Sequence, residues 1–209
     1  MAPLRRTLAP GSVNRLRGRS SLPTVSVIGS GTRDRPDLTE PLGSALARRD
    51  VDLITGGGRG VMAGVCRSFT GVPERAGRCI GILPAHPDRP GEAADGYPNP
   101  WVEIAIRTHL AERGETGDGP GSRNHLVVLS GGVVVALPGG AGTRSELRLA
   151  ARYRRPVLLL GWPREALADE VEGGPGSAPG PRPVEVERSW RQARSVEEAL
   201  EALDPLLAG

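Results

Sequence analysis

Short apolar runs rich in β-branched residues alternate along the chain with segments whose apolar positions recur at helical spacing. The runs that lead into turns or glycine loops predict strands at 24–31, 51–60, 78–84, 101–108, 133–140 and 156–162. The helically spaced segments predict helices at 37–50, 61–69, 122–131, 143–154 and 195–208. This alternation indicates an α/β fold of Rossmann-like, doubly wound type, with a mostly parallel sheet and helices on both faces.

The local signals at the ends of these segments refine the prediction. The alternating residues of 101–108 suit a strand at the edge of the sheet. We expect Ser122 to cap the helix that it begins, and Ser195 with Glu198 to form a capping box. Proline- and glycine-rich composition predicts irregular loops at 85–100, 112–121 and 172–183.

Length and hydropathy define the organisation that we expect. The 209 residues suit one domain, so we predict a single Rossmann-like nucleotide-binding domain over 21–209 behind a tail of residues 1–20. No apolar run approaches the ~20 residues that span a bilayer, and residues 1–20 hold no signal-peptide core. We therefore expect a cytoplasmic protein with no membrane partner.

The basic character of the chain is concentrated in its tail. The net charge is +3, but residues 1–20 hold five of the 27 arginines and no acid, which leaves 22 basic residues against 24 acidic ones. We predict a solvated, disordered tail and no nucleic-acid partner. The alternative, RNA binding through the tail, would give a salt-sensitive affinity that disappears when residues 1–20 are removed.

The composition also excludes several kinds of chemistry. The sequence has no lysine, so neither a Schiff-base lysine nor an ordinary Walker A site is available. Cys66 and Cys79 lack zinc-site spacing and are expected to be core or near-core thiols. His86, His109 and His125 show no ligand spacing to each other or to the cysteines, so we expect no metal site.

Three glycine-rich loops follow predicted strands, at 29–31, 56–60 and 139–142. Ligands of parallel sheets bind beyond the carboxyl ends of the strands, where helix N-termini offer free N–H groups. Each loop alone is equally well explained by steric needs, but one phosphate ligand bridging all three explains them together. The expected ligand-binding residues are Gly29, Ser30, Gly31, Gly57, Gly58, Gly60, Met62, Pro138, Gly139, Gly140, Gly142 and Thr143. The dinucleotide fingerprint is incomplete at 29–34, which argues against NAD.

Two charged residues flank the third loop. Glu146 lies about one helical turn beyond Gly142, so its carboxylate can point back toward the same ligand. The alternative is an acid that stabilises only the helix dipole. Arg123 and Asn124 begin a neighbouring helix and can clamp a phosphate or hydroxyl, unless Arg123 is simply solvated.

The motif PGGAGTRSE (138–146) resembles the PGG-x-GT-x-x-E signature of the LOG family, the cytokinin-activating phosphoribohydrolases once labelled lysine decarboxylases. The stretch GGGRGVMAG (56–64) resembles the companion glycine motif of that family. The stretches TGGGRGVM, IGILP and SRN are similar to bacterial relatives of the molybdenum-cofactor carrier protein, which share the fold, over about residues 24–162.

The resemblance implies a Rossmann-like homodimer or higher oligomer that binds a nucleoside 5′-monophosphate or a pterin-type phosphate and requires no further cofactor. LOG-like chemistry would hydrolyse the N-glycosidic bond to free base and ribose 5-phosphate, with Glu146 and Arg123 as catalytic residues. The family pattern also implies ligand roles for Gly139, Gly140, Gly142 and Thr143.

The alternative function is a non-catalytic carrier or sensor that holds a nucleotide or molybdenum cofactor in the same loops. LOG enzymes usually have Arg-Lys where this chain has Arg123-Asn124, and the loop GSGTRDR (29–35) also differs from theirs. In a carrier, the loop at 85–100 would act as a lid.

Overall fold

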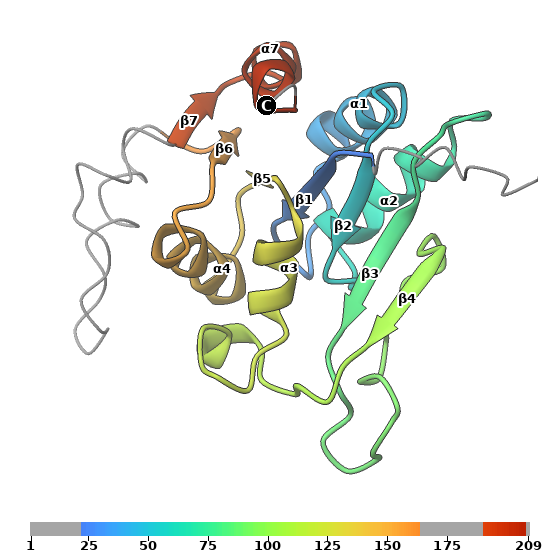
Figure 1. The fold of residues 1–209 in the computed structure, drawn as a ribbon, viewed down its shortest axis with the longest axis vertical. Helices are drawn as coiled ribbons and strands as arrows, with labels where there is room; N and C mark the ends of the chain where they lie inside the picture. Colours follow the sequence, from blue (N-terminus) through green and yellow to red (C-terminus); the bar gives the residue numbers. More distant parts are fainter. Residues whose placement is uncertain (1–21, 164–189, 208–209) are drawn as a thin grey trace, which may run out of the picture.

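The computed structural model describes residues 22–163 and 190–207, which share a seven-stranded sheet in the order β4-β3-β2-β1-β5-β6-β7 (Figure 1). Every strand pair is parallel. The strands are β1 Thr24–Ile28, β2 Asp52–Thr55, β3 Cys79–Leu83, β4 Ile104–Arg107, β5 Val133–Ala136, β6 Val157–Leu160 and β7 Trp190–Ala193. The helices are α1 Pro36–Ala47, α2 Val61–Thr70, α3 Asn124–Ser130, α4 Ala141–Arg152 and α7 Val196–Leu207, with a 3₁₀ turn at Gly114–Thr116.

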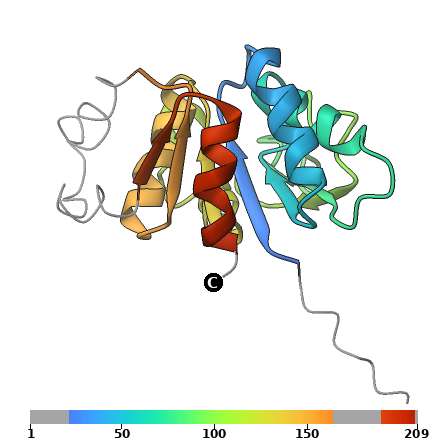
Figure 2. The ribbon, with the colours of Figure 1, turned by 90° about the horizontal axis from the view of Figure 1, so that it is seen from above.

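Helices cover both faces of this sheet (Figure 2). On one face, α1, α2 and α7 bury a core cluster that includes Val25, Leu53 and Leu203. On the other face, α3 and α4 bury a second cluster that includes Ile28 and Val134. The sequence therefore predicted the fold class correctly, because apolar strands buried on both sides are typical of parallel sheets.

The six predicted strands and five predicted helices are all present, and β4 is an edge strand as expected. The seventh strand, β7, was missed because its sequence WRQA has polar residues between the buried Trp190 and Ala193. The predicted tail 1–20 and the predicted loop 172–183 lie outside the described residues. No helix in the part of the chain that the structure describes has the length and apolarity that crossing a bilayer requires.

The two predicted caps differ in detail from the structure. Helix α3 begins at Asn124 with Arg123 as the capping position, although the Ser122 hydroxyl still accepts a hydrogen bond from the Asn124 N–H at 3.2 Å. At α7, the Ser195 hydroxyl accepts the Glu198 N–H at 3.3 Å, as the capping box requires. The Glu198 carboxylate, however, accepts the N–H of Arg194 at 2.8 Å. The first half of the box is therefore confirmed, and its return bond is shifted by one residue.

The chain leaves the sheet in opposite directions from its two central strands, β1 and β5. From β1 it proceeds through β2 and β3 to the β4 edge, and from β5 through β6 to the β7 edge. At such a switch point the chain turns away in opposite directions after the two strands, which opens a crevice beyond their carboxyl ends. The order of strands thus places the loops after Ile28 and Ala136 side by side.

Helices α1 and α2 approach each other closely at Gly43. A Cβ on Gly43 would lie 2.6 Å from the carbonyl oxygen of Val65 and would also meet the Ser68 hydroxyl. The Ser68 hydroxyl donates across the same contact to the Thr39 carbonyl at 2.7 Å. Glycine is therefore required here by contact between two backbones.

We expect Gly43→Ala to lower the free energy of unfolding by about 2 kcal/mol, because the added methyl group overpacks this contact. In a free helix the same change would be stabilising by roughly 1 kcal/mol. Urea denaturation measures the difference, with Ser44→Ala on the same helix as a control that should change stability by less than about 0.5 kcal/mol. A Gly43→Ala protein as stable as the parent would show that α1 and α2 separate at no cost.

Candidate functional site

The loops after β1, β2 and β5 meet at the carboxyl end of the sheet. The Val61 N–H at the start of α2 donates to the Ser30 carbonyl at 2.9 Å, which joins the first loop to the second. A Cβ on Gly139 would lie 2.9 Å from the Ser30 nitrogen, so the first and third loops are also in direct contact. The predicted convergence of the three glycine loops is therefore present in the structure.

A cavity of about 400 Å³ opens between these loops. Ten of the predicted site residues line it: Gly29, Ser30, Gly31, Met62, Arg123, Asn124, Gly140, Gly142, Thr143 and Glu146. The sequence interpretation missed four further lining residues, Thr32, Tyr97, Arg113 and Gly114. We call this cavity the Glu146 cleft.

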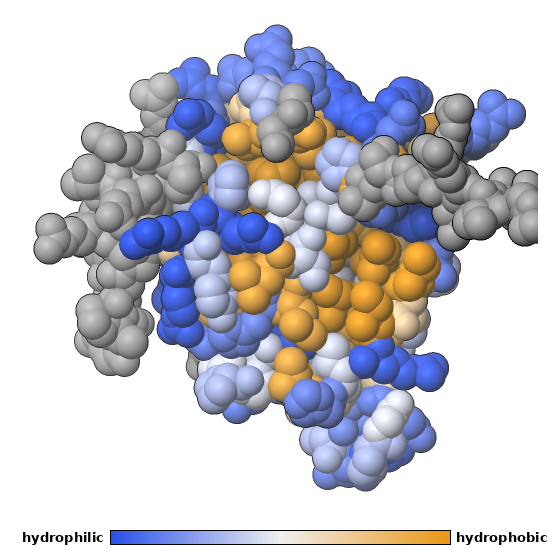
Figure 3. All heavy atoms as spheres, viewed as in Figure 1, coloured by the Kyte–Doolittle hydropathy of each residue, from blue (hydrophilic) through white to orange (hydrophobic). Residues whose placement is uncertain are grey.

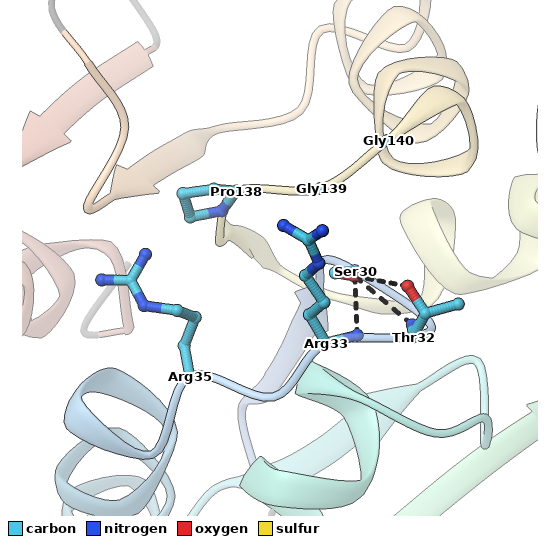
Figure 4. Close-up of a pocket in the computed structure, with 7 residues that line it drawn as sticks. All are labelled: Ser30, Thr32, Arg33, Arg35, Pro138, Gly139 and Gly140. Atoms are coloured by element: carbon cyan, nitrogen blue, oxygen red, sulfur yellow. Dashed lines mark hydrogen bonds between the residues drawn. The ribbon is translucent and has the colours of Figure 1, made fainter.

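A second cavity, of about 510 Å³, adjoins the Glu146 cleft and shares Ser30, Thr32 and Gly140 with it (Figure 4). Its other lining residues are Arg33, Arg35, Pro138 and Gly139. The predicted site residues Pro138 and Gly139 therefore lie here, while the two arginines were not predicted.

The three remaining predicted residues, Gly57, Gly58 and Gly60, line neither cavity and instead allow close packing. Gly57 and Gly60 have φ angles of +71° and +58°, which favour glycine. A Cβ on Gly57 would meet the Leu83 side chain, and one on Gly60 would meet the Ser30 carbonyl oxygen. These glycines therefore allow the second loop to pack closely against the first loop and α2.

The N-terminus of α4 provides the feature of the cleft best suited to an anion. Its capping residue, Gly140, provides no side-chain hydrogen bond to the first-turn N–H groups, and a Cβ there would meet nothing within 4 Å. The buried Thr143 lies in the same first turn and lines the cleft. Free N–H groups and the helix dipole at such an end favour a phosphate or a carboxylate.

Glu146 is a buried carboxylate that faces this anion-binding end from the same helix. It is only 7% exposed, and its closest charged partner among the described residues is Arg123, with Nη1 to Oε1 at 3.8 Å. Burial raises the pKa of Glu146 from 4.5 to about 7, although the Arg123 charge partly opposes the shift. An acid held in this state near neutral pH is costly to the fold and is typical of functional sites.

Arg123 is held in place by neighbouring groups. Its guanidinium donates to the Asn124 side-chain oxygen and, at 3.3 Å, to the Gly56 carbonyl, while its Nε is buried without a partner. A Cβ on Gly56 would clash with the guanidinium. Gly56 thus makes room for Arg123, and the solvated alternative is wrong because the residue is 4% exposed.

The far wall of the Glu146 cleft comes from loops that the sequence described only as irregular. Tyr97 belongs to the loop at 85–100, and Arg113 belongs to the loop at 112–121. The Arg113 guanidinium carbon lies 6.0 Å from the centre of the Tyr97 ring, which is within reach of a cation–π contact. Met62 lies beside Tyr97, because a Cβ on Gly58 would meet both side chains, and together they suit an aromatic or heterocyclic group.

The described residues contain no group of three or more histidine, cysteine, aspartate or glutamate side chains arranged to hold a metal ion. Cys66 and Cys79 are both buried, as the sequence predicted. The cleft itself offers backbone N–H groups, the four hydroxyls of Ser30, Thr32, Tyr97 and Thr143, the Asn124 amide, one carboxyl and two guanidiniums.

Comparison with known proteins supports the resemblance seen in the sequence. A family model described as the SLOG cluster4 family matches residues 22–178. An uncharacterized protein of Archaeoglobus fulgidus is 28% identical over 138 residues, which cover 65% of this chain and 78% of that protein.

Two similar solved structures belong to proteins of molybdenum-cofactor transport or binding. The molybdenum cofactor carrier protein of Chlamydomonas reinhardtii is 27% identical, with a TM-score of 0.62 over 90% of this chain and 99% of that one. The molybdenum cofactor binding protein of the phototrophic bacterium Rippkaea orientalis is 26% identical, with a TM-score of 0.66 and the same coverage. The expected link to LOG-like proteins of the carrier branch is therefore confirmed.

The raised pKa of Glu146 predicts how stability depends on pH. The native carboxyl keeps its proton up to about pH 7, whereas the unfolded one releases it near 4.5, so stability falls as pH rises through this window. In the parent, the free energy of unfolding should fall by about 3 kcal/mol across this window, and Glu146→Gln, which cannot ionise, should not show this fall. Urea denaturation at pH 5, 6, 7 and 8 measures both profiles. Parallel pH profiles for both proteins would mean that the carboxylate is not desolvated in the native state.

Proposed function

Because the chain belongs to the SLOG cluster4 family, we propose that its Glu146 cleft binds a small phosphorylated ligand of nucleotide type. The phosphate lies at the N-terminus of α4, where Gly140, Gly142 and Thr143 supply N–H groups and a hydroxyl. The heterocyclic part of the ligand extends toward Met62 and Tyr97. Such an arrangement needs no further cofactor.

We propose further that the bound ligand is a nucleoside 5′-monophosphate and that the protein hydrolyses its N-glycosidic bond. The observation that carries this proposal is Glu146, a buried carboxyl beside the phosphate end with Arg123 3.8 Å away. Cleavage of an N-glycosidic bond develops positive charge on the ribose ring, which a carboxylate stabilises. With a pKa of about 7, Glu146 can both stabilise this charge and accept a proton from the attacking water.

Arg123 assists the same reaction from α3. Its charge lies within reach of Glu146 and favours the ionised form of that carboxyl. Its bonds to Asn124 and Gly56 fix the guanidinium before a ligand arrives, so that little entropy is lost when it orients the phosphate or the leaving base. The products are the free base and ribose 5-phosphate.

A second candidate function is the holding of a phosphorylated pterin such as molybdenum cofactor without chemistry. The similar solved structures of a molybdenum cofactor carrier protein and of a molybdenum cofactor binding protein favour it. Asn124 also favours it. This residue stands where LOG enzymes usually have a lysine, and its side-chain oxygen accepts a hydrogen bond from the Arg123 guanidinium. In this case Tyr97 and Met62 would hold the pterin ring, and the cofactor would be cargo.

We expect the purified protein to release base from at least one member of a panel of nucleoside 5′-monophosphates, AMP included. Glu146→Gln should reduce this release by at least about 10³-fold, because the charged transition state loses its carboxylate. Chromatography of free base and ribose 5-phosphate measures the reaction. Ser44→Ala, remote from the cleft, is the matched control and should retain full turnover.

The opposite outcome would select the carrier. If no nucleotide loses its base but one of them raises the melting temperature, the cleft binds without hydrolysis. Molybdenum or a fluorescent pterin that copurifies with the protein would then identify the cargo class. Turnover that persists in Glu146→Gln would remove this residue from the mechanism.

We also propose that the protein is a homo-oligomer in which β4 and α3 form the contact. Among the described residues, no helix lies in the connection from β3 to β4. Ile104 and Ile106 are each 44% exposed, and Leu126 and Leu129 of α3 are about 40% exposed. These residues form an apolar surface over β4 and α3 (Figure 3), and a two-fold contact would place this surface against its own copy.

We expect Ile106→Asp to dissociate this oligomer, since a charge would be buried at the contact. Light scattering coupled to size exclusion should show the mass of one chain for the variant and of two or more for the parent. Leu206→Asp, on an exposed residue of α7 remote from this surface, should keep the parent mass. A parent protein with the mass of one chain would refute the proposed contact.

A further inference from the structure

The second cavity adjoins the anion-binding end of the Glu146 cleft and carries two guanidiniums. Arg33 and Arg35 come from the loop between β1 and α1, and Pro138, Gly139 and Gly140 form the opposite side. Figure 4 shows the Arg33 guanidinium reaching toward Pro138 and Gly139. The cavity is therefore a basic pocket next to the N-terminus of α4.

The two arginines differ in how free they are to bind an anion. Arg35 already donates two hydrogen bonds to Asp37, at 3.0 and 2.7 Å, which neutralises much of its charge. Arg33 has no carboxylate within ion-pair distance among the described residues, and only its backbone N–H is engaged, with the Ser30 hydroxyl at 3.0 Å. Arg33 is thus the principal cationic group of this pocket.

The loop that carries Arg33 is held rigidly. The Ser30 hydroxyl accepts the N–H groups of both Thr32 and Arg33, and the Arg35 N–H donates to the Asp34 carboxylate at 2.8 Å. Asp34 also accepts a hydrogen bond from the Thr39 hydroxyl of α1 at 2.9 Å. The backbone that positions Arg33 therefore needs little ordering when an anion binds.

The two cavities share Ser30, Thr32 and Gly140 as lining residues. A phosphate at the start of α4 would lie beside Gly140, which lines both cavities, so a group attached to it can extend toward either one. In one direction it meets Met62 and Tyr97, and in the other it meets Arg33. A monophosphate would leave the second cavity, of about 510 Å³, without any ligand group.

We propose that the second cavity is a subsite for a second phosphoryl group and that the physiological ligand contains a pyrophosphate. This inference rests on the proposed phosphate site at α4. Arg33 binds the second phosphoryl group through its guanidinium, and the Thr32 hydroxyl adds a neutral donor. The second cavity, of about 510 Å³, has room for such a group, so a nucleoside diphosphate or a pyrophosphate-linked nucleotide fits better than a monophosphate.

The test compares binding of inorganic phosphate with inorganic pyrophosphate, and of AMP with ADP, by isothermal titration calorimetry on the full chain. We expect each diphosphate to bind at least about tenfold more tightly than its monophosphate partner, the effect of one charge-assisted contact. In Arg33→Gln this preference should fall to about twofold or less. Arg35→Gln should reduce the preference less, because Asp37 already neutralises that side chain.

Arg48→Gln controls for the loss of one positive charge. Arg48 caps the far end of α1, at the opposite end of the helix from Arg33, and is exposed. A charge so remote is largely screened at 0.15 M salt, so the variant should keep the full tenfold preference.

The outcomes separate this inference from the proposed function. If phosphate or AMP binds but the diphosphates bind no better, the subsite is refuted while the cleft stands. A preference that survives in Arg33→Gln would also refute it, because the gain would then come from the general charge of the ligand. If none of the four compounds binds, both the phosphate site at α4 and the subsite fail.

Discussion

The parallel pairing of β1 with β5 at the centre of the sheet determines where the candidate chemistry lies. Because the chain proceeds outward in opposite directions from these two strands, the loops that follow them face each other across a crevice. The contact between Gly139 and Ser30 brings the backbones of these loops as close as glycine allows. The α4 N-terminus, Glu146 and the arginines of the first loop all gather around that contact.

The position of Arg123 illustrates how this arrangement organises charge. A buried guanidinium needs hydrogen-bond acceptors, and the structure provides the Gly56 carbonyl and the Asn124 side chain. Gly56 is the residue that leaves space for the guanidinium, so the second glycine loop contributes to the cleft without lining it. Glu146 then lies between this fixed positive charge and the dipole of its own helix, while burial keeps its proton bound up to about pH 7.

Local sequence signals predicted most elements of the fold and the residues that line the cleft around the start of α4. Apolar strands ending in glycine are recognisable in one sequence, because each signal lies within a few adjacent residues. Strand β7 was missed, since Arg191 and Gln192 interrupt its apolar pattern. Gly57, Gly58 and Gly60 were assigned to the ligand, but they line neither cavity. Gly57 and Gly60 have positive φ angles, and a Cβ on any of the three would meet a neighbouring group. One sequence cannot separate these two needs for glycine.

Sequence interpretation also missed residues that irregular loops contribute to the two cavities, namely Tyr97, Arg113, Arg33 and Arg35. Their place depends on how these loops fold back over the sheet. This origin has an evolutionary consequence. The proposed phosphate end is built from strand ends and a helix start, and changes there would disturb the core. The cleft wall formed by Tyr97 and Arg113 belongs to loops with few buried apolar residues. Relatives can therefore diverge in the molecule they hold through loop changes alone, while the sheet and its glycine turns stay the same.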